Sequence, residues 1–207
     1  LGIYIFLLLF LYYLKTRRFR NLVVCLSCLL CLGIYHTVMR WYDRPCPSLV
    51  FYNVRGCPAI HCIAEDGTSW LNYADTLSDK RRLQAVAANY WRRHQLLPPI
   101  EVTADCQNVD FCRHQQIVFY HGCRICMVTD NRWRNKSAAS PLFINYMYLC
   151  KGYNGRLEEL TGLFSPSCIL LDASLSDDRK QFFREECKRL HLHFITLSEE
   201  GSVRFLL

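Results

Sequence analysis

Residues 59–73 read AIHCIAEDGTSWLNY, two largely apolar runs that meet at Glu65-Asp66-Gly67. An Asp-Gly pair between apolar runs is a strong hairpin signal, because glycine readily takes the positive φ of a tight turn. We therefore predict two antiparallel strands, one on each side of this turn. The β-rich run at residues 49–55 precedes them and ends at Gly56-Cys57-Pro58, which predicts another strand.

Downstream of the hairpin, helical and strand patterns alternate. Apolar residues at Leu83, Ala87 and Trp91 recur at helical spacing and predict a helix over residues 78–96. Similar patterns predict helices at 156–163 and 176–190, and strands at 116–120, 123–129, 142–149, 168–171, 191–197 and 203–207. Hairpins followed by helix–strand units indicate an α/β domain (α+β, layered) over residues 45–207.

Residues 1–44 have a different composition. Residues 1–14 and 22–39 contain no acidic or basic side chain, and the basic loop 15–21 separates them. Eighteen mostly apolar residues can span a ~30 Å hydrocarbon core. We therefore predict two transmembrane α-helices, the first cut at its start. A cleavable signal peptide is less favoured, because the basic cluster follows the first apolar run instead of preceding it. A buried hairpin of a soluble protein is also less favoured, and Tyr12, Tyr13, Trp41 and Tyr42 lie at the ends of the apolar runs, as aromatic residues do at membrane interfaces.

The basic residues around the second apolar run predict its orientation. Lys15, Arg17, Arg18 and Arg20 precede it, whereas only Arg40 and Arg44 follow it. Basic residues are enriched in cytoplasmic loops. The domain at 45–207 is therefore expected outside the cytoplasm (periplasmic), attached to a multi-pass protein of the inner (plasma) membrane.

The formal charge of +7 does not by itself indicate a nucleic-acid-binding domain. From residue 49 onward, 19 Lys and Arg stand against 17 Asp and Glu, so most of the surplus lies near the apolar runs. Local basic clusters remain, and the simplest interpretation of them is solvated helix and loop faces. Their members are Arg81, Arg82, Arg92, Arg93, Arg132, Arg134 and Lys136.

No nucleotide-binding, hydrolase or metal motif is present, and we predict no cofactor. Cys123 and Cys126 form a C-x-x-C inside a predicted strand, where a redox or zinc motif would not sit. His191 and His193 alternate along another predicted strand, so both imidazoles would share one face, but a third metal ligand is missing nearby. Asp172 ends a buried strand. From the sequence it could be either a functional residue or a residue that stabilises a turn. Asp75 carries the same ambiguity.

The chain resembles the C-terminal part of ComEC-type DNA-internalisation (competence) proteins, in their Bacteroidetes-like form. The resemblance covers essentially the whole chain and consists of dispersed features. These are the two apolar helices with their basic loop, residues 49–54, Ala59-Ile60-His61, Asp66-Gly67, Trp70, Glu158-Glu159-Leu160, Leu163-Phe164, residues 168–174, residues 184–190 and Gly201.

The resemblance implies an inner-membrane channel for natural transformation and a metallo-β-lactamase-like C-terminal domain. In such domains, an acidic turn follows the first strand and an H-x-H-x-D-H cluster binds metals. Here the turn reads NVRGCPA over residues 53–59, and the histidine cluster is absent from residues 75–94. Metal-assisted hydrolysis needs such ligands. We therefore expect a degenerate domain that is not an enzyme, with no catalytic residue and no metal.

Our leading hypothesis is a structural or DNA-guiding domain of the uptake channel, whose remainder precedes Leu1. Its partners would be the membrane and single-stranded DNA, bound through phosphate attraction and aromatic stacking. The predicted DNA-binding residues are Arg92, Arg93, Arg132 and Arg134. Trp91 and Trp133 flank them, with Trp91 better explained as a core residue.

Two alternatives remain open. The first is a metal-dependent nuclease whose ligands converge only in the folded chain. Those ligands would come from His61, His121, His191, His193, Asp75 and Asp172. The second is a membrane-tethered protein-interaction module without a nucleic-acid role, which dispersed basic clusters and a large exposed apolar patch would favour.

Overall fold

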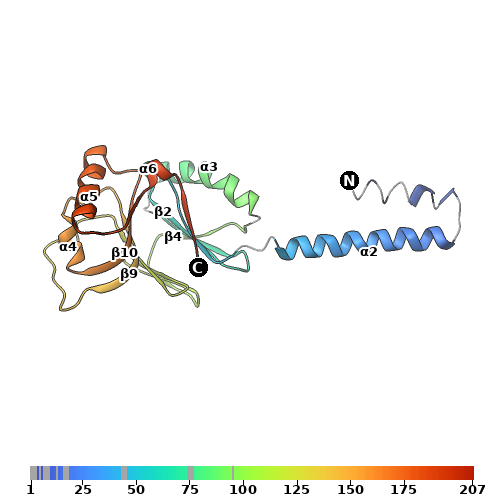
Figure 1. The fold of residues 1–207 in the computed structure, drawn as a ribbon, viewed down its shortest axis with the longest axis horizontal. Helices are drawn as coiled ribbons and strands as arrows, with labels where there is room; N and C mark the ends of the chain where they lie inside the picture. Colours follow the sequence, from blue (N-terminus) through green and yellow to red (C-terminus); the bar gives the residue numbers. More distant parts are fainter. Residues whose placement is uncertain are drawn as a thin grey trace. The chain divides into compact units, whose positions relative to one another are not determined.

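The computed structural model describes residues 4, 6, 10–12, 14–15, 19–42, 46–73, 77–94 and 96–207 (Figure 1). They fall into two units, Leu1–Arg44 and Pro45–Leu207. The hydrophobic clusters described below consist entirely of residues of the second unit, which therefore contains its own core.

The first unit contains helix α2 (Phe19–Tyr42). It includes all of residues 22–39 and confirms that this stretch is helical. Among the residues that the structure describes, no helix has the length and apolar character that crossing a membrane takes. The predicted membrane spans are therefore not confirmed. Much of the predicted helix 1–14 and of the loop 15–21 lies outside the described residues.

The second unit is built on two β-sheets. The first sheet has the order β12-β1-β2-β3-β4, formed by β1 (Ser48–Phe51), β2 (Ala59–Ile63), β3 (Ser69–Tyr73), β4 (Ile100–Val102) and β12 (Val203–Leu206). The β2–β3 hairpin is confirmed, and the Asp66 carboxylate stabilises its turn by accepting hydrogen bonds from the backbone nitrogen and hydroxyl of Thr68. Strand β4 runs parallel to β3, because helix α3 (Leu77–Arg93) crosses over between them.

The second sheet has the order β11-β10-β9-β8-β7-β6-β5. Its strands are β5 (Cys106–Gln107), β6 (Phe111–His114), β7 (Ile117–Tyr120), β8 (Cys123–Val128), β9 (Leu142–Leu149), β10 (Phe164–Leu171) and β11 (Phe194–Thr196). Strands β8 to β11 are parallel, whereas β5 to β8 are antiparallel. The parallel strands bring the loops that follow β8, β9 and β10 to one edge of the sheet.

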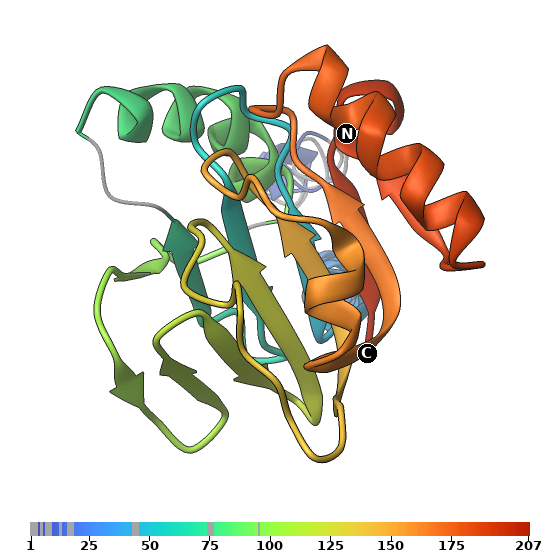
Figure 2. The ribbon, with the colours of Figure 1, turned by 90° about the vertical axis from the view of Figure 1, so that its left-hand side faces the viewer.

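Helices cover the outer faces of the two sheets (Figure 2). Helix α3 packs on the first sheet through Leu83 and Ala87. Helices α4 (Leu157–Thr161) and α5 (Asp177–Arg189) pack on the second sheet, the latter through Phe183 and Cys187. The short helix α6 (Leu197–Glu200) precedes β12. The result is a layered order of helix, sheet, sheet and helix, in agreement with the predicted α/β class.

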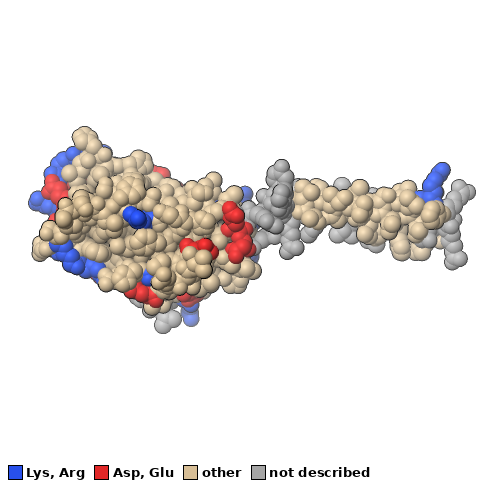
Figure 3. Space-filling view, turned by 90° about the horizontal axis from the view of Figure 1, so that it is seen from below, with Lys and Arg blue, Asp and Glu red and all other residues tan. Residues whose placement is uncertain are grey.

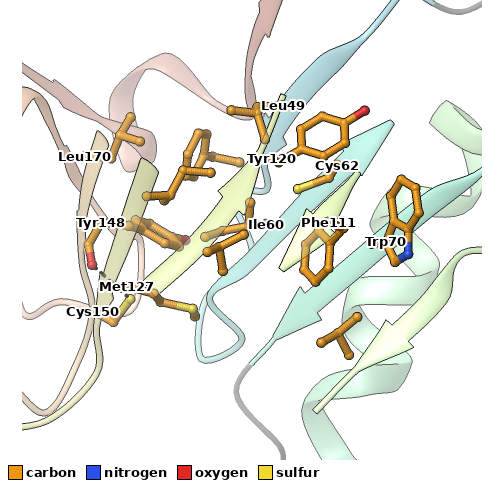
Figure 4. Packing of buried hydrophobic residues seen from close by; sticks show 14 of the residues in the cluster. Leu49, Ile60, Cys62, Trp70, Phe111, Tyr120, Met127, Tyr148, Cys150 and Leu170 are labelled. Carbon is orange, nitrogen blue, oxygen red and sulfur yellow. Dashed lines mark hydrogen bonds between the residues drawn. The ribbon is translucent and has the colours of Figure 1, made fainter. Parts of the chain in front are cut away.

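The central core lies between the two sheets, with side chains contributed by both (Figure 4). Alternation along β1 and the residue that follows it explains why residues 49–52 are all apolar or aromatic. Leu49 and Phe51 point into the central core, while Val50 and Tyr52 point toward α3. Because both faces of the strand are buried, neither face needs polar residues.

The structure departs from the sequence predictions near the C-terminus. Residues 191–193 are not part of a strand: His191 has a positive φ of 53° in the turn after α5, and His193 precedes β11. The prediction that His191 and His193 share one strand face is therefore wrong. Strand β10 also begins at Phe164, four residues before the predicted 168–171, because pairing with β9 starts at Leu142.

Candidate nucleic-acid interface

A cleft opens where the loops after β9 and β10 meet the β1–β2 turn and helix α3. Its cavity volume is about 530 Å³. It is lined by Arg55, Gly56, Arg82, Lys151, Gly152, Tyr153, Asn154, Ser174, Leu175, Ser176 and Arg179. Among the described residues that line it, four have basic side chains and none has a carboxylate. We refer to this group of lining residues as the cationic cleft.

The β1–β2 turn brings Arg55 into the cationic cleft. The backbone nitrogen of Cys57 donates to the carbonyl of Val54 over 3.1 Å, which closes a four-residue turn. Gly56 occupies its third position with a φ of 89°, which glycine adopts without strain. Arg55 is left exposed at the corner of this turn.

Three of the four cations of the cleft have no counter-ion in the described part of the chain. Arg55, Arg82 and Lys151 are exposed, and none forms an ion pair with a described side chain. Like charges that line a concave surface raise its potential, because low-dielectric walls focus the field. The cationic cleft is therefore suited to an anion.

Arg179 is held differently from the other three. Its Nη2 donates to the carbonyl oxygens of Tyr153 and Gly155, over 3.3 and 3.0 Å. Its guanidinium carbon lies 4.8 and 4.4 Å from the ring centroids of Phe182 and Phe183. Stacking and carbonyl contacts fix this side chain while leaving its charge without a carboxylate partner. Arg179 thus supports the wall of the cleft and contributes positive charge to it.

Asp172 lies directly beneath the cleft lining. It is completely buried and accepts hydrogen bonds from the hydroxyl of Tyr148 and from the hydroxyl and backbone nitrogen of Ser174. Burial raises the pKa of its carboxyl above the ordinary value. This is the geometry of an aspartate that stabilises a turn. Of the two roles left open from the sequence, Asp172 has the turn role, and it fixes Ser174, which lines the cleft.

The loop after β9 forms the other wall through a tight backbone approach. Gly152 has a φ of 117°, and a Cβ there would stand 2.3 Å from the carbonyl oxygen of Thr129. The neighbouring Asn154 donates its backbone nitrogen to the side-chain oxygen of Asn131 over 2.8 Å. These contacts tie the loop after β9 to the loop after β8 and so position Lys151.

The structure does not gather the four predicted DNA-binding arginines. Arg92 and Arg93 lie in the last turn of α3, whereas Arg132 and Arg134 lie in the loop after β8. None of them lines the cationic cleft. Arg93 is nonetheless exposed on α3, eleven residues after Arg82, a spacing that places both near one helical face.

Two of these arginines are engaged with carboxylates. Arg132 makes a two-pronged contact with Asp130, with nitrogen–oxygen distances of 2.8 to 3.0 Å. Nε of Arg134 lies 3.4 Å from a carboxylate oxygen of Glu159. Arg92 instead donates to Asn89 of its own helix over 2.9 Å. Engagement with acids lowers the attraction of Arg132 and Arg134 for another anion.

The two tryptophans flanking these arginines are half-buried and hydrogen-bonded. Nε1 of Trp91 donates to the hydroxyl of Tyr52 over 3.0 Å, in agreement with a core role. Nε1 of Trp133 donates to the side-chain oxygen of Gln116 over 2.6 Å, and the amine of Lys136 lies 5.3 Å from the Trp133 ring centroid.

One face of the domain carries both acidic and basic side chains. On the face seen in Figure 3, Lys, Arg, Asp and Glu are separated by wide areas of other residues. This distribution agrees with the near balance of charge after residue 49. The cationic cleft therefore stands out by local convergence and not by a general excess of positive charge.

The candidate metal ligands lie in separate parts of the domain. His61 is completely buried between its sheet and α3, and desolvation lowers its pKa to about 3. His121 occupies the β7–β8 turn, at the end of β8 opposite the cleft. His193 contacts the sulfur of Cys168 through Nδ1, over 3.2 Å. Within the described residues, no group of three or more His, Cys, Asp or Glu is placed to hold a metal ion.

Two further predictions about metal or redox chemistry can be placed. Asp75 lies outside the described residues. Cys123 and Cys126 lie on β8 as predicted, with Cys123 packed against the central core and Cys126 in the cluster beneath α5. Burial raises the pKa of both thiols, which disfavours the reactive thiolate. This C-x-x-C is therefore a structural element of the sheet.

Sequence reasoning missed most of the cleft. Arg82 belonged to a recognised basic cluster, and the turn containing Arg55 had been noted for its lost carboxylates. Lys151 and Arg179 carry no local signal, because only the parallel strand order brings their loops together.

Comparison with known proteins gives one match. The family model described as ComEC C-terminal domain matches residues 49–207. No curated protein and no solved structure matches the chain. The matched residues contain both sheets except Ser48, the first residue of β1, and every residue of the cationic cleft.

Proposed function

The chain belongs to the family of ComEC C-terminal domains, membrane proteins that serve DNA uptake in competence, and we propose that this domain guides DNA without cutting it. The observation that carries this proposal is the cationic cleft, whose described lining residues include four basic side chains and no carboxylate. Phosphate groups are the anions that DNA offers, and lysine and arginine bind them.

The layered architecture supports a metallo-β-lactamase-like origin for the domain. Two sheets face each other around a shared core, and helices cover both outer faces. The turn after β1, where the resemblance implies metal-binding carboxylates, contributes Arg55 to the cleft instead. Divalent metal sites are built from carboxylate, imidazole or thiolate ligands. Clustered cations at this place disfavour a metal ion electrostatically, which supports a domain without nuclease activity.

DNA binding would be driven by phosphate attraction. Arg55, Arg82 and Lys151 are exposed and free of counter-ions in the described part of the chain, so binding a phosphate breaks no existing ion pair. Arg93 extends the positive charge along α3. A single DNA strand that leaves the cleft along α3 would therefore meet the side chain of Arg93.

The experiment is DNA binding by the full chain, purified in detergent, using a fluorescent single-stranded oligonucleotide. Binding is measured at low and high salt, with and without manganese or zinc. We expect salt-sensitive binding and an intact oligonucleotide in every condition. Metal-dependent cleavage would establish the nuclease alternative, and absence of binding at low salt would leave a structural role in the channel.

A matched pair of variants locates the interface. The triple variant Arg55→Gln, Lys151→Gln and Arg82→Gln removes the three cations that have no ion pair with a described side chain. The double variant Arg132→Gln and Arg134→Gln removes two arginines that already face carboxylates. The proposal requires that the triple variant lose most of the affinity and that the double variant keep it.

We also propose that the domain faces the outside of the cytoplasm. The support is the excess of basic residues at Lys15, Arg17, Arg18 and Arg20 over Arg40 and Arg44. Protease added to intact spheroplasts should then digest the domain while a cytoplasmic marker survives. Protection of the domain until the cells are lysed would reverse the orientation.

A further inference from the structure

The cations of the cleft converge instead of following a line. Arg55 comes from the β1–β2 turn, Arg82 from α3, Lys151 from the loop after β9 and Arg179 from α5. A protein that binds a strand along its length spaces its cations along the backbone path. Here four segments that are distant in sequence place their charges around one cavity, which favours a concentrated anion.

The size of the cavity agrees with a single bound group. Its volume of about 530 Å³ lies within the range of small-molecule pockets. The lining also offers neutral hydrogen-bonding groups, the hydroxyls of Ser174 and Ser176 and the amide of Asn154. One phosphate group with part of its nucleotide would fit such a site, whereas a long stretch of strand would extend beyond it.

A phosphate at the end of a strand matches this charge better than one within it. An internal phosphodiester carries one negative charge, while a terminal phosphate monoester carries about −1.5 to −2 at pH 7. The monoester also presents three acceptor oxygens, which suits guanidinium groups that bind in a fork. Coulomb attraction to the same cations grows in proportion to the ligand charge.

In the described part of the chain, the acidic side chains that adjoin Ser174 and Ser176 of the cleft lining do not line the cleft themselves. Asp177 and Asp178 begin helix α5 but do not line the cleft, and the carboxylate of Asp177 lies 3.3 Å from the amine of Lys180. Asp172 is buried beneath Ser174 with both carboxylate oxygens engaged. The anion would therefore meet cations and hydroxyls at the surface of the cleft.

We propose that the cationic cleft binds the terminal phosphate of a DNA strand, so that the domain recognises a DNA end. This proposal rests on the proposed DNA-guiding function and deepens it by naming the part of DNA that the site takes. Arg55, Arg82 and Lys151 contact the phosphate, and Arg179 is a positioning residue that holds the wall.

The test compares oligonucleotides of one sequence that differ only at their ends. One carries a 5′-phosphate, one a 3′-phosphate, and one has hydroxyls at both ends. Fluorescence anisotropy with the full chain in detergent should show affinity on the order of tenfold higher for a phosphorylated end. Phosphatase treatment of the oligonucleotide should remove the difference, and inorganic phosphate should compete with the phosphorylated end.

Variants assign the preference to the cleft. Arg82→Gln and Lys151→Gln should each reduce the preference for the phosphorylated end several-fold, whereas Arg132→Gln should retain it. Thermal unfolding of each variant verifies that the domain is folded. A preference that survives both cleft variants would overturn the assignment of the site.

The outcomes separate this proposal from the function on which it rests. Equal, salt-sensitive affinity for all three oligonucleotides would overturn end recognition and leave DNA guidance standing. Absence of binding to any oligonucleotide would overturn both.

Discussion

The hydroxyl oxygen of Tyr52 lies 2.9 Å from Nδ1 of His61 beneath helix α3. The same hydroxyl accepts a hydrogen bond from Nε1 of Trp91 over 3.0 Å. Because this hydroxyl accepts from Trp91, its own proton can be donated to Nδ1 of His61, which places the imidazole proton on Nε2. This chain of three side chains joins the residue after β1 to β2 and α3, on the face of the sheet remote from the central core.

Removing the Tyr52 hydroxyl should destabilise the domain. Tyr52→Phe leaves the Trp91 nitrogen and the His61 nitrogen without their partner in a buried site. An unsatisfied buried polar group costs about 1–3 kcal/mol. Urea denaturation of the Pro45–Leu207 unit should show a loss of stability of this size.

Tyr90→Phe is the matched control, because no hydrogen bond of the Tyr90 hydroxyl is found in the described part of the chain. Its effect on the free energy of unfolding should stay within about 0.5 kcal/mol. Equal effects of the two variants would refute the role of the Tyr52 hydroxyl.

Buried His61 should make stability depend on pH. Desolvation lowers its pKa to about 3 in the folded state, compared with 6.5 as the ordinary value. Between these values the unfolded state binds a proton that the folded state does not bind, so the free energy of unfolding falls as pH falls. The loss is on the order of 1.4 kcal/mol per pH unit below about pH 6.

The measurement is urea denaturation of the Pro45–Leu207 unit at pH 7.5, 6.5 and 5.5. His61→Phe removes the titrating group, and its stability should change less over this range than that of the natural sequence. The comparison is needed because the carboxyl of Asp172, with a raised pKa, contributes a slope of opposite sign at lower pH. Parallel pH profiles for the two proteins would contradict a buried, neutral His61.

Local patterns predicted most of the elements of the domain. The hairpin around Asp66-Gly67 and the helix at Ser176 follow from turn and capping chemistry that acts over a few residues. Short strands such as β5, with two residues, carry too little pattern to detect. The predicted strand over His191 and His193 failed because α5 ends in a turn with positive φ at His191, a conformation that histidine adopts uncommonly.

The candidate site could be predicted only in part. Arginine clusters are visible in sequence, but whether a cation is free depends on tertiary partners such as Glu159, which lies 25 residues after Arg134. The cleft itself depends on strand order, because β8, β9 and β10 must be parallel neighbours before their loops meet. None of the four cleft cations was among the predicted DNA-binding residues, although Arg82 belonged to a basic cluster noted in the sequence.

Gly152 should not tolerate a side chain. A Cβ at this position would stand 2.3 Å from the backbone oxygen of Thr129, and its φ of 117° is unfavourable for other residues. Gly152→Ala should therefore destabilise the Pro45–Leu207 unit by about 3 kcal/mol or more, combining strain with a backbone clash. Gly67→Ala is the control, since φ is also positive there but no atom lies within 4 Å of the added Cβ. Its cost should be about 1 kcal/mol. If thermal or urea unfolding shows similar losses of stability for Gly152→Ala and Gly67→Ala, the close approach at Gly152 is contradicted.

The salt dependence of DNA binding should distinguish cleft cations from paired ones. Each cation that neutralises a phosphate of single-stranded DNA contributes about −0.7 to the slope of log K against log salt, because a counter-ion is released. Lys151→Gln should therefore weaken binding and reduce the magnitude of this slope by roughly 0.7 to 1.

Arg132→Gln is the informative counterpart, because the Arg132 guanidinium already faces both oxygens of Asp130 over 2.8 to 3.0 Å. Its replacement removes one positive charge, as Lys151→Gln does, so the two variants have the same net charge. A long-range effect of net charge would change both slopes equally. Direct phosphate contact in the cleft requires a smaller slope for Lys151→Gln and an unchanged slope for Arg132→Gln. The reverse result would place the DNA contact in the loop after β8, which contains two of the four DNA-binding residues predicted from the sequence.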